Sequence, residues 1–188
     1  MKKQPEITDK TRQKFVDAFW DIAVEKPISK ISVSELTRRA GYNRSTFYEY
    51  FLDTDDLLTY VESALLEEIK QTVSLALPEE NSPEHMFRIL FTSLNERLYV
   101  LIGPNGDSGF LSRIRAELVP IATSYLPIQT DLVNFDYLAC YVNSAMFGLM
   151  QHWNEKGKNI SAEEISAIMH NLIFHGLQAY INTEPEPN

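Results

Sequence analysis

Residues 31–51 constrain the fold of this chain more than any other segment, because they carry the signals of two short helices joined by a tight turn. Ser32 is a favourable N-cap, and Glu35 three residues later completes a capping box. Leu36 is placed to point inward from the helix that follows. Gly41 comes directly after that helix, where a left-handed C-cap favours glycine. The segment therefore predicts a helix-turn-helix.

The second helix of this pair begins at Asn43 or Arg44, and Phe47 and Phe51 give it a buried pair at i and i+4. Its other side chains face outward, as in a helix that enters the major groove of DNA. The motif offers side chains that can reach phosphates or base edges. The candidate DNA-binding residues are Ser34, Tyr42, Arg44, Ser45, Thr46, Tyr48 and Tyr50.

The polar side chains of the second helix differ in the contact that each is expected to make. Arg44 is the first candidate for base readout, because a guanidinium fork matches O6 and N7 of guanine. The alternative for Arg44 is a solvated or phosphate-bound side chain. Ser45 and Thr46 can bond to a phosphate or to a base edge. The hydroxyls of Tyr48 and Tyr50 are expected to bind phosphates.

Two further candidates lie outside the second helix. Tyr42, in the turn, is expected either to contact the DNA backbone or to pack against the domain. Ser34 lies near the start of the first helix of the motif, where it can help the backbone N–H groups hold a phosphate.

The net charge of −9 argues at first against a nucleic-acid partner, but the charge is unevenly distributed. Residues 1–50 hold ten Lys or Arg and seven Asp or Glu, a net charge of +3. The remaining residues hold seven Lys or Arg and nineteen Asp or Glu, a net charge of −12. This asymmetry is typical of a DNA-facing end attached to an acidic body that DNA repels.

Taken together, the motif and its flanking helices resemble the DNA-binding domain of TetR-family transcriptional regulators over residues 8–60. The resemblance implies a homodimer that binds a palindromic operator on double-stranded DNA, as a repressor relieved by a small-molecule effector. The effector would change the separation of the two recognition helices. The residues that carry the resemblance are Val33, Leu36, Ala40, Gly41, Ser45, Thr46, Phe47, Tyr48, Tyr50, Phe51, Asp56, Leu57 and Leu58.

Several positions depart from the family pattern. Thr54 stands where the family usually has a phosphate-binding lysine, and Asp53, Asp55 and Asp56 surround it. Glu49 adds a further negative charge, unless it accepts a hydrogen bond from N4 of a cytosine. The sequence therefore predicts modest DNA affinity with a shallow salt dependence. Tyr50 also departs from the pattern, because the family often has histidine there.

The hydrophobic periodicity predicts an all-α fold. The resemblance implies that an N-terminal three-helix DNA-binding domain precedes a larger helical effector-binding and dimerisation domain. We place the first domain at 1–53, the second at 54–182 and a disordered tail at 183–188. A helix with its apolar face at Phe15, Ala18, Phe19, Ile22 and Ala23 is expected over 8–25. The later helices are expected at 54–77, 82–102, 107–126 with a bend near Pro120, 131–156 and 161–181.

The two last predicted helices carry broad apolar stripes. Packed in pairs across a two-fold axis, they would form a four-helix bundle between two copies. The alternative is that they cover the core of their own chain. The candidate dimer-interface residues are Leu138, Val142, Leu149, Trp153, Ile165, Met169, Leu172, Ile173, Gly176 and Tyr180.

The body also carries aromatic residues that could line a ligand chamber. Plain core is the alternative for each of them. The candidate ligand-binding residues are Phe87, Phe91, Phe110, Tyr125, Tyr137, Tyr141, Met150 and His152.

Other classes of protein find little support in the sequence. It has no nucleophile elbow, phosphate-binding glycine loop or His-Glu-x-x-His, so we expect no enzyme, cofactor or metal site. Cys140 is the only cysteine, and no leader or membrane-spanning run is recognised, which favours the cytoplasm. The rival interpretation is a helical ligand- or protein-binding module that has lost its DNA affinity, and a transcriptional activator is also open.

Overall fold

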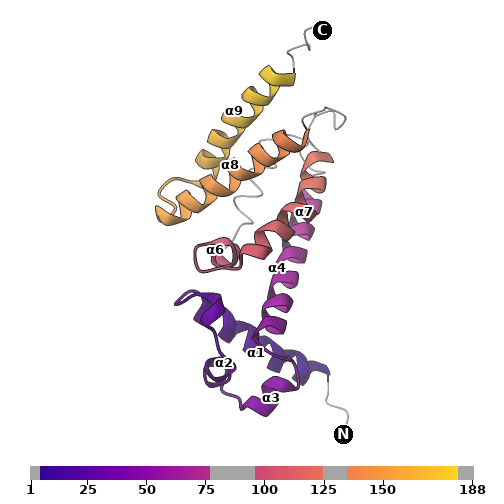
Figure 1. The fold of residues 1–188 in the computed structure, drawn as a ribbon, viewed down its shortest axis with the longest axis vertical. Coiled ribbons are helices and arrows are strands. Elements are labelled where there is room, and N and C mark those ends of the chain that lie inside the picture. Colours follow the sequence, from indigo (N-terminus) through magenta and orange to yellow (C-terminus); the bar gives the residue numbers. More distant parts are fainter. Residues whose placement is uncertain (1–4, 77–95, 125–134, 182–188) are drawn as a thin grey trace. The chain divides into compact units, whose positions relative to one another are not determined.

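A computed structural model of the chain describes residues 5–76, 96–124 and 135–181, and the described residues are helical without a strand. The elements are labelled in Figure 1. Their bounds are α1 Pro5–Ala23, η1 (a 3-10 turn) Ile28–Lys30, α2 Val33–Ala40, α3 Arg44–Tyr48, α4 Thr54–Ala76, α6 Glu96–Ile102, α7 Ser108–Ser124, α8 Phe135–Glu155 and α9 Ala162–Ile181. The predicted all-α fold is confirmed.

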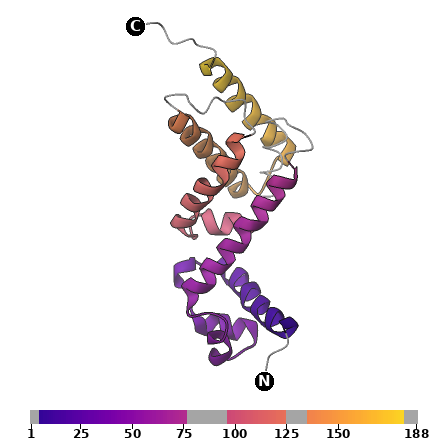
Figure 2. The same ribbon diagram turned by 90° about the vertical axis from the view of Figure 1, so that its right-hand side faces the viewer.

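The chain divides into two compact units, Met1–Glu67 with Glu96–Leu111, and Glu68–Asn95 with Ser112–Asn188. In the first unit, α2 and α3 lie beside α1 and the first turns of α4 in both views (Figures 1 and 2). The predicted domain boundary between 53 and 54 stays a prediction.

Helix α1 supplies the apolar face that the periodicity predicts. All five residues of that face are at most 4% exposed, namely Phe15, Ala18, Phe19, Ile22 and Ala23. Burying each phenylalanine contributes roughly 1.5–3 kcal/mol relative to leaving it in water. The helix therefore holds the rest of the unit together through one continuous stripe.

The ends of α2 are fixed by local hydrogen bonds that the sequence predicts. Ser32 Oγ accepts from the backbone N–H of Glu35, and the Glu35 carboxylate accepts from the backbone N–H of Ser32 at 3.2 Å, which confirms the capping box. Gly41 has φ 75°, in the left-handed region that a side chain would strain. The backbone N–H of Tyr42 donates to the Thr37 carbonyl at 2.9 Å and completes the turn. These two caps set the direction in which the chain enters α3.

Helix α4 begins at a reciprocal cap of aspartates. Asp53 Oδ1 accepts from the backbone N–H groups of Asp55 and Asp56 at 3.0 and 2.9 Å. Asp56 Oδ2 in turn accepts from the backbone N–H of Leu52 at 2.9 Å. Asp53 and Asp56 therefore have a structural role, because their carboxylates cap the positive N-terminus of a 23-residue helix.

In the second unit, α8 and α9 are joined by a tight turn at Gly157 and Lys158, both with positive φ. Ser161 and Glu164 form a second capping box, with bonds of 2.8 and 3.1 Å. Helix α7 runs unbroken through Pro120 to Ser124, and the predicted bend near Pro120 stays a prediction. Other predicted ends differ by a few residues, and residues 82–95 and 131–134 lie outside the described part of the chain.

Candidate nucleic-acid interface

Asn43 organises the start of α3. Its side-chain Oδ1 accepts from the backbone N–H of Thr46 at 2.8 Å, from the Ser45 hydroxyl at 2.6 Å and from the Thr46 hydroxyl at 3.1 Å. Phe47 is fully buried, and Phe51 is 4% exposed although it lies beyond the end of the helix. The predicted burial of both phenylalanines is confirmed, but α3 ends at Tyr48, so Tyr50 and Phe51 follow the helix and do not belong to it as predicted.

The hydrogen bonds to Asn43 determine what two of the candidate residues can offer. Because the Ser45 and Thr46 hydroxyls both donate to Asn43, their hydrogen atoms are committed and their lone pairs remain. A phosphate oxygen only accepts, so binding it would break one of these bonds. An amino group on a base edge donates a hydrogen bond, so binding it would leave both bonds to Asn43 intact. The sequence analysis missed this role of Asn43, although asparagine at an N-cap was the available signal.

Five of the seven candidate residues lie at the surface. Ser34, Tyr42, Arg44, Ser45 and Tyr48 are exposed, whereas Thr46 and Tyr50 are half-buried. The exposed fraction of Tyr48 is 56%. The structure thus brings Arg44, Ser45 and Tyr48 together on the outer face of one short helix, and the DNA contacts of all seven stay predictions.

Charged side chains around the motif are partly neutralised within the unit. Arg39 pairs with Glu25 at 3.0 Å and with Asp21 at 3.8 Å, and the Glu25 hydrogen bond raises the pKa of Arg39. Within the described residues, Arg44 makes no such ion pair. The exposed Arg44 side chain can therefore face a ligand without first leaving a described acidic partner.

An ion pair also anchors the capping box. Lys26 Nζ lies 2.5 Å from Glu35 Oε1, and the Ser32 hydroxyl donates to Glu35 Oε2 at 2.7 Å. These two hydrogen bonds, that from Lys26 first, lower the pKa of Glu35 from 4.5 to about 2. The Glu35 side chain is 32% exposed, so solvent screens part of the attraction.

The lowered pKa of Glu35 predicts a measurable acid sensitivity. The folded state disfavours the proton, so this contribution to stability is complete above pH 4.5 and is lost as the pH falls toward 2. Glu35→Gln should reduce the dependence of Tm on pH within this window, measured by circular dichroism. Glu163→Gln, an exposed acid of α9, is the matched control. Equal pH dependence of Tm in the wild type and Glu35→Gln would contradict the assignment.

An aromatic cluster supports α3 from behind. The Phe15 ring centroid lies 5.5 Å from Tyr42, 5.3 Å from Phe47, 6.3 Å from Tyr50 and 6.4 Å from Phe51. One residue of α1 therefore contacts the turn, the recognition helix and the segment after it. Tilted and edge-on arrangements of this kind are favourable for aromatic pairs.

The candidate ligand-binding residues that the structure describes differ in burial. Phe110 belongs to the first unit and is buried, and Met150 is buried in α8. Tyr137 and Tyr141 are 73% and 59% exposed, and His152 is exposed. The remaining candidates, Phe87, Phe91 and Tyr125, lie outside the described residues.

The candidate dimer residues separate into three groups. Trp153, Ile165 and Met169 are buried within the single chain, and Trp153 Nε1 donates to the Ile160 carbonyl at 2.9 Å. For these three, the alternative of a plain core accounts for their burial. The half-buried residues are Leu138, Val142 and Leu149, the exposed ones are Leu172 and Gly176, and the side chains of Ile173 and Tyr180 are outside the described set.

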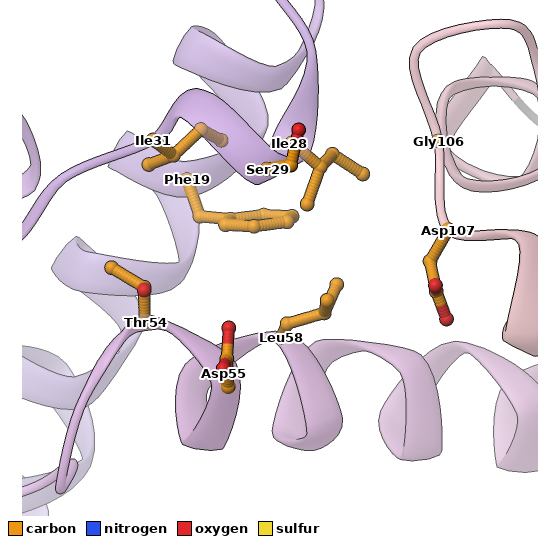
Figure 3. A pocket seen from close by; sticks show the side chains of 9 residues that line it. All are labelled: Phe19, Ile28, Ser29, Ile31, Thr54, Asp55, Leu58, Gly106 and Asp107. Carbon is orange, nitrogen blue, oxygen red and sulfur yellow. The ribbon is translucent and has the colours of Figure 1, made fainter.

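A cavity of about 210 Å³ lies within the first unit (Figure 3). Phe19 and Leu58 face each other across it. The other lining residues are Ile28, Ser29, Ile31, Thr54, Asp55, Gly106 and Asp107. Chambers for drug-sized ligands usually measure about 300–1,000 Å³. This cavity is smaller and contains none of the predicted ligand-binding residues.

The described residues contain no group of three or more metal-ligating side chains. Among the described helices, none has the length and apolarity needed to cross a membrane.

The fold and the outer face of α3 define a helix-turn-helix protein of the transcription-regulator class. Residues 16–61 match the family of bacterial regulatory proteins of the TetR type, and residues 81–175 match a transcriptional regulator C-terminal region of the same family. The chain belongs to the TetR family. The members to which it is similar are transcriptional regulators rather than enzymes.

The sequence of a bacterial relative agrees with this family assignment. The chain is 27% identical over 155 residues to the uncharacterised HTH-type transcriptional regulator YxbF of Bacillus subtilis, a match that covers 79% of this chain and 40% of that protein. The chain thus matches less than half the length of this relative.

Solved structures share the fold. The fatty acid degradation regulator FadR from Bacillus halodurans has a TM-score of 0.68 at 17% identity, covering 95% of this chain and 99% of that one. A TetR-family transcriptional regulator from Streptomyces coelicolor has a TM-score of 0.63 at 17% identity, covering 92% and 83%. At this level of identity the likeness shows the fold alone.

Proposed function

We propose that this chain regulates transcription by binding a palindromic operator on double-stranded DNA as a homodimer, and that it acts as a cytoplasmic repressor released by a small molecule. The observation that carries the proposal is the outer face of α3, where Arg44, Ser45 and Tyr48 are exposed above a rigid cap and a buried aromatic cluster. A surface helix whose N-terminus is capped, and whose arginine makes no ion pair with the described residues, suits major-groove recognition.

Within this proposal the polar side chains of α3 have different roles. Arg44 reads a guanine through O6 and N7. Ser45 and Thr46 accept hydrogen bonds from base amino groups, because their own hydrogen atoms are held by Asn43. Tyr48 donates its hydroxyl to a phosphate and fixes the register of the helix.

The dimer is proposed to form through α8 and α9. Ile168 and Leu172 of α9 are 41% and 66% exposed, and Gly176 one turn further is also exposed. An exposed apolar stripe that ends at a glycine allows a second helix to approach closely. A second copy also supplies the second recognition helix, because one helix of five residues reads too few base pairs.

The direction of regulation rests on the resemblance alone. One structural neighbour is a dihydroxyacetone kinase operon activator, DhaS, with a TM-score of 0.57 at 18% identity, covering 90% of this chain and 97% of that one. An activator therefore stays the alternative within the same DNA-binding function. The rival module without DNA affinity is favoured by Thr54 and by the acids around it.

The salt dependence of binding tests this function. We expect binding to duplex DNA whose log–log salt slope is clearly shallower than about −10, since the α4 cap is acidic and lacks the phosphate-binding lysine. Thr54→Lys should steepen the slope by about 0.9 for each phosphate gained, whereas Thr59→Lys, five residues further along α4, should change it little. Fluorescence anisotropy between about 50 and 200 mM salt measures both. A wild-type slope near −10 contradicts the acidic-cap argument, and no binding at low salt supports the rival module.

A further inference from the structure

Arg12 of α1 lies against two tyrosines from other parts of the first unit. Its guanidinium carbon is 5.9 Å from the ring centroid of Tyr50 and 5.7 Å from that of Tyr60. Its Nη1 atom is 3.5 Å from Asp9 Oδ1. One side chain thereby connects α1 to the segment after the recognition helix and to α4.

Tyr50 is held from two directions. Its ring lies 6.3 Å from Phe15, which is fully buried, and Arg12 lies over the same ring. Tyr60 in turn lies 5.7 Å from Phe51. The aromatic cluster behind α3 thus continues outward through two tyrosines and ends at a cation that is about one-third exposed.

We propose that Arg12 is a positioning residue for DNA binding, which holds the Tyr50 ring so that its hydroxyl is directed at a phosphate. This inference rests on the proposed function. It adds a residue of α1 to a recognition surface otherwise built from the helix-turn-helix. The sequence alone predicts a phosphate contact for Tyr50, but it does not show which side chains hold the Tyr50 ring.

The guanidinium suits this task better than an ammonium group. It is planar and delocalised, so it can stack on aromatic faces while its N–H groups keep the pair with Asp9. A lysine at the same position retains the charge but loses the planar contact. The exchange of Arg12 for lysine therefore separates positioning from simple electrostatic attraction.

The test compares Arg12→Lys with Arg38→Lys, a charge-conserving exchange at an exposed arginine of α2. Affinity for duplex DNA is measured by fluorescence anisotropy at a temperature where circular dichroism shows every variant folded. Arg12→Lys should weaken binding by about 2- to 5-fold, the range of an exposed cation–π contact, while Arg38→Lys binds like the wild type.

A double-mutant cycle tests whether Arg12 affects DNA affinity through Tyr50. If Arg12 acts through the Tyr50 hydroxyl, Arg12→Lys should have little further effect once Tyr50→Phe has removed that hydroxyl. Unchanged affinity of Arg12→Lys, or losses that add in the double variant, would overturn the inference while leaving DNA binding intact. A folded wild-type protein that binds no DNA would overturn the proposed function and this inference with it.

Discussion

Arg44→Ala is expected to reduce the discrimination between operator and unrelated DNA by about 1–3 kcal/mol for each half-site, a factor of roughly 5 to 150. The reason is that Arg44 is exposed at the start of α3, makes no ion pair with the described residues and can present both donors of its fork to one guanine. Competition binding of labelled operator against scrambled DNA directly measures the ratio of the two affinities.

Tyr48→Phe provides the comparison for this result. It removes one hydroxyl from a 56% exposed side chain and keeps the ring, which packs 5.6 Å from Phe47. A lost phosphate contact weakens binding to all sequences alike and leaves the ratio unchanged. If Arg44→Ala instead behaves like Tyr48→Phe, with its sequence preference intact, the assignment of base readout to Arg44 is wrong.

Phe15→Ala should have the largest effect on stability. Phe15 is fully buried and contacts four aromatic rings, so removing its ring lowers the free energy of unfolding by about 3–5 kcal/mol. This is a large part of the roughly 5–15 kcal/mol that stabilises an ordinary protein. Thermal and urea unfolding, followed by circular dichroism, measure the loss.

The matched control is Phe15→Leu, which keeps most of the apolar volume and should cost clearly less than the alanine variant. DNA binding of Phe15→Ala should also fall, because Tyr42, Phe47 and Tyr50 lose their common support. An alanine variant that unfolds within about 1 kcal/mol of the wild type would show that the cluster is not the centre of this unit.

Features encoded within a few residues could be predicted from the sequence. The capping boxes of Ser32 and Ser161, the left-handed Gly41 and the Asp53 cap depend on local backbone geometry, and the structure has each of them. The apolar face of α1 was predictable for the same reason, since 3.6-residue periodicity alone places Phe15 and Phe19 together.

Contacts between distant segments could not be predicted. Arg12 and Tyr60 are 48 positions apart, and only the packing of α1 on α4 brings them together. The neutralisation of Arg39 by Asp21 and Glu25 likewise depends on how α2 faces α1. A count of net charge per segment therefore does not tell which basic side chains already have an acidic partner within the unit.

For the apolar stripes of α8 and α9, the sequence predicts the shared face but not the surface that covers it. Periodicity tells which residues of α8 and α9 share a face, but it does not tell whether that face meets its own chain or a second copy. For some residues, burial distinguishes a face that meets its own chain from a face that is left for a second copy. Trp153 and Met169 already pack within the chain, whereas Leu172 remains 66% exposed. Leu172 is therefore better evidence for a proposed interface than Trp153.

The most direct measurement is selection of binding sites from random duplex DNA with the purified protein at low salt, followed by sequencing. A homodimeric regulator with α3 as its reading helix predicts a palindromic consensus, whose half-sites are spaced by about one helical turn, 10–10.5 base pairs, or a multiple of it. Arg44→Ala should lose preference at one position of each half-site. No enrichment from the folded protein, or a consensus without two-fold symmetry, would contradict the account.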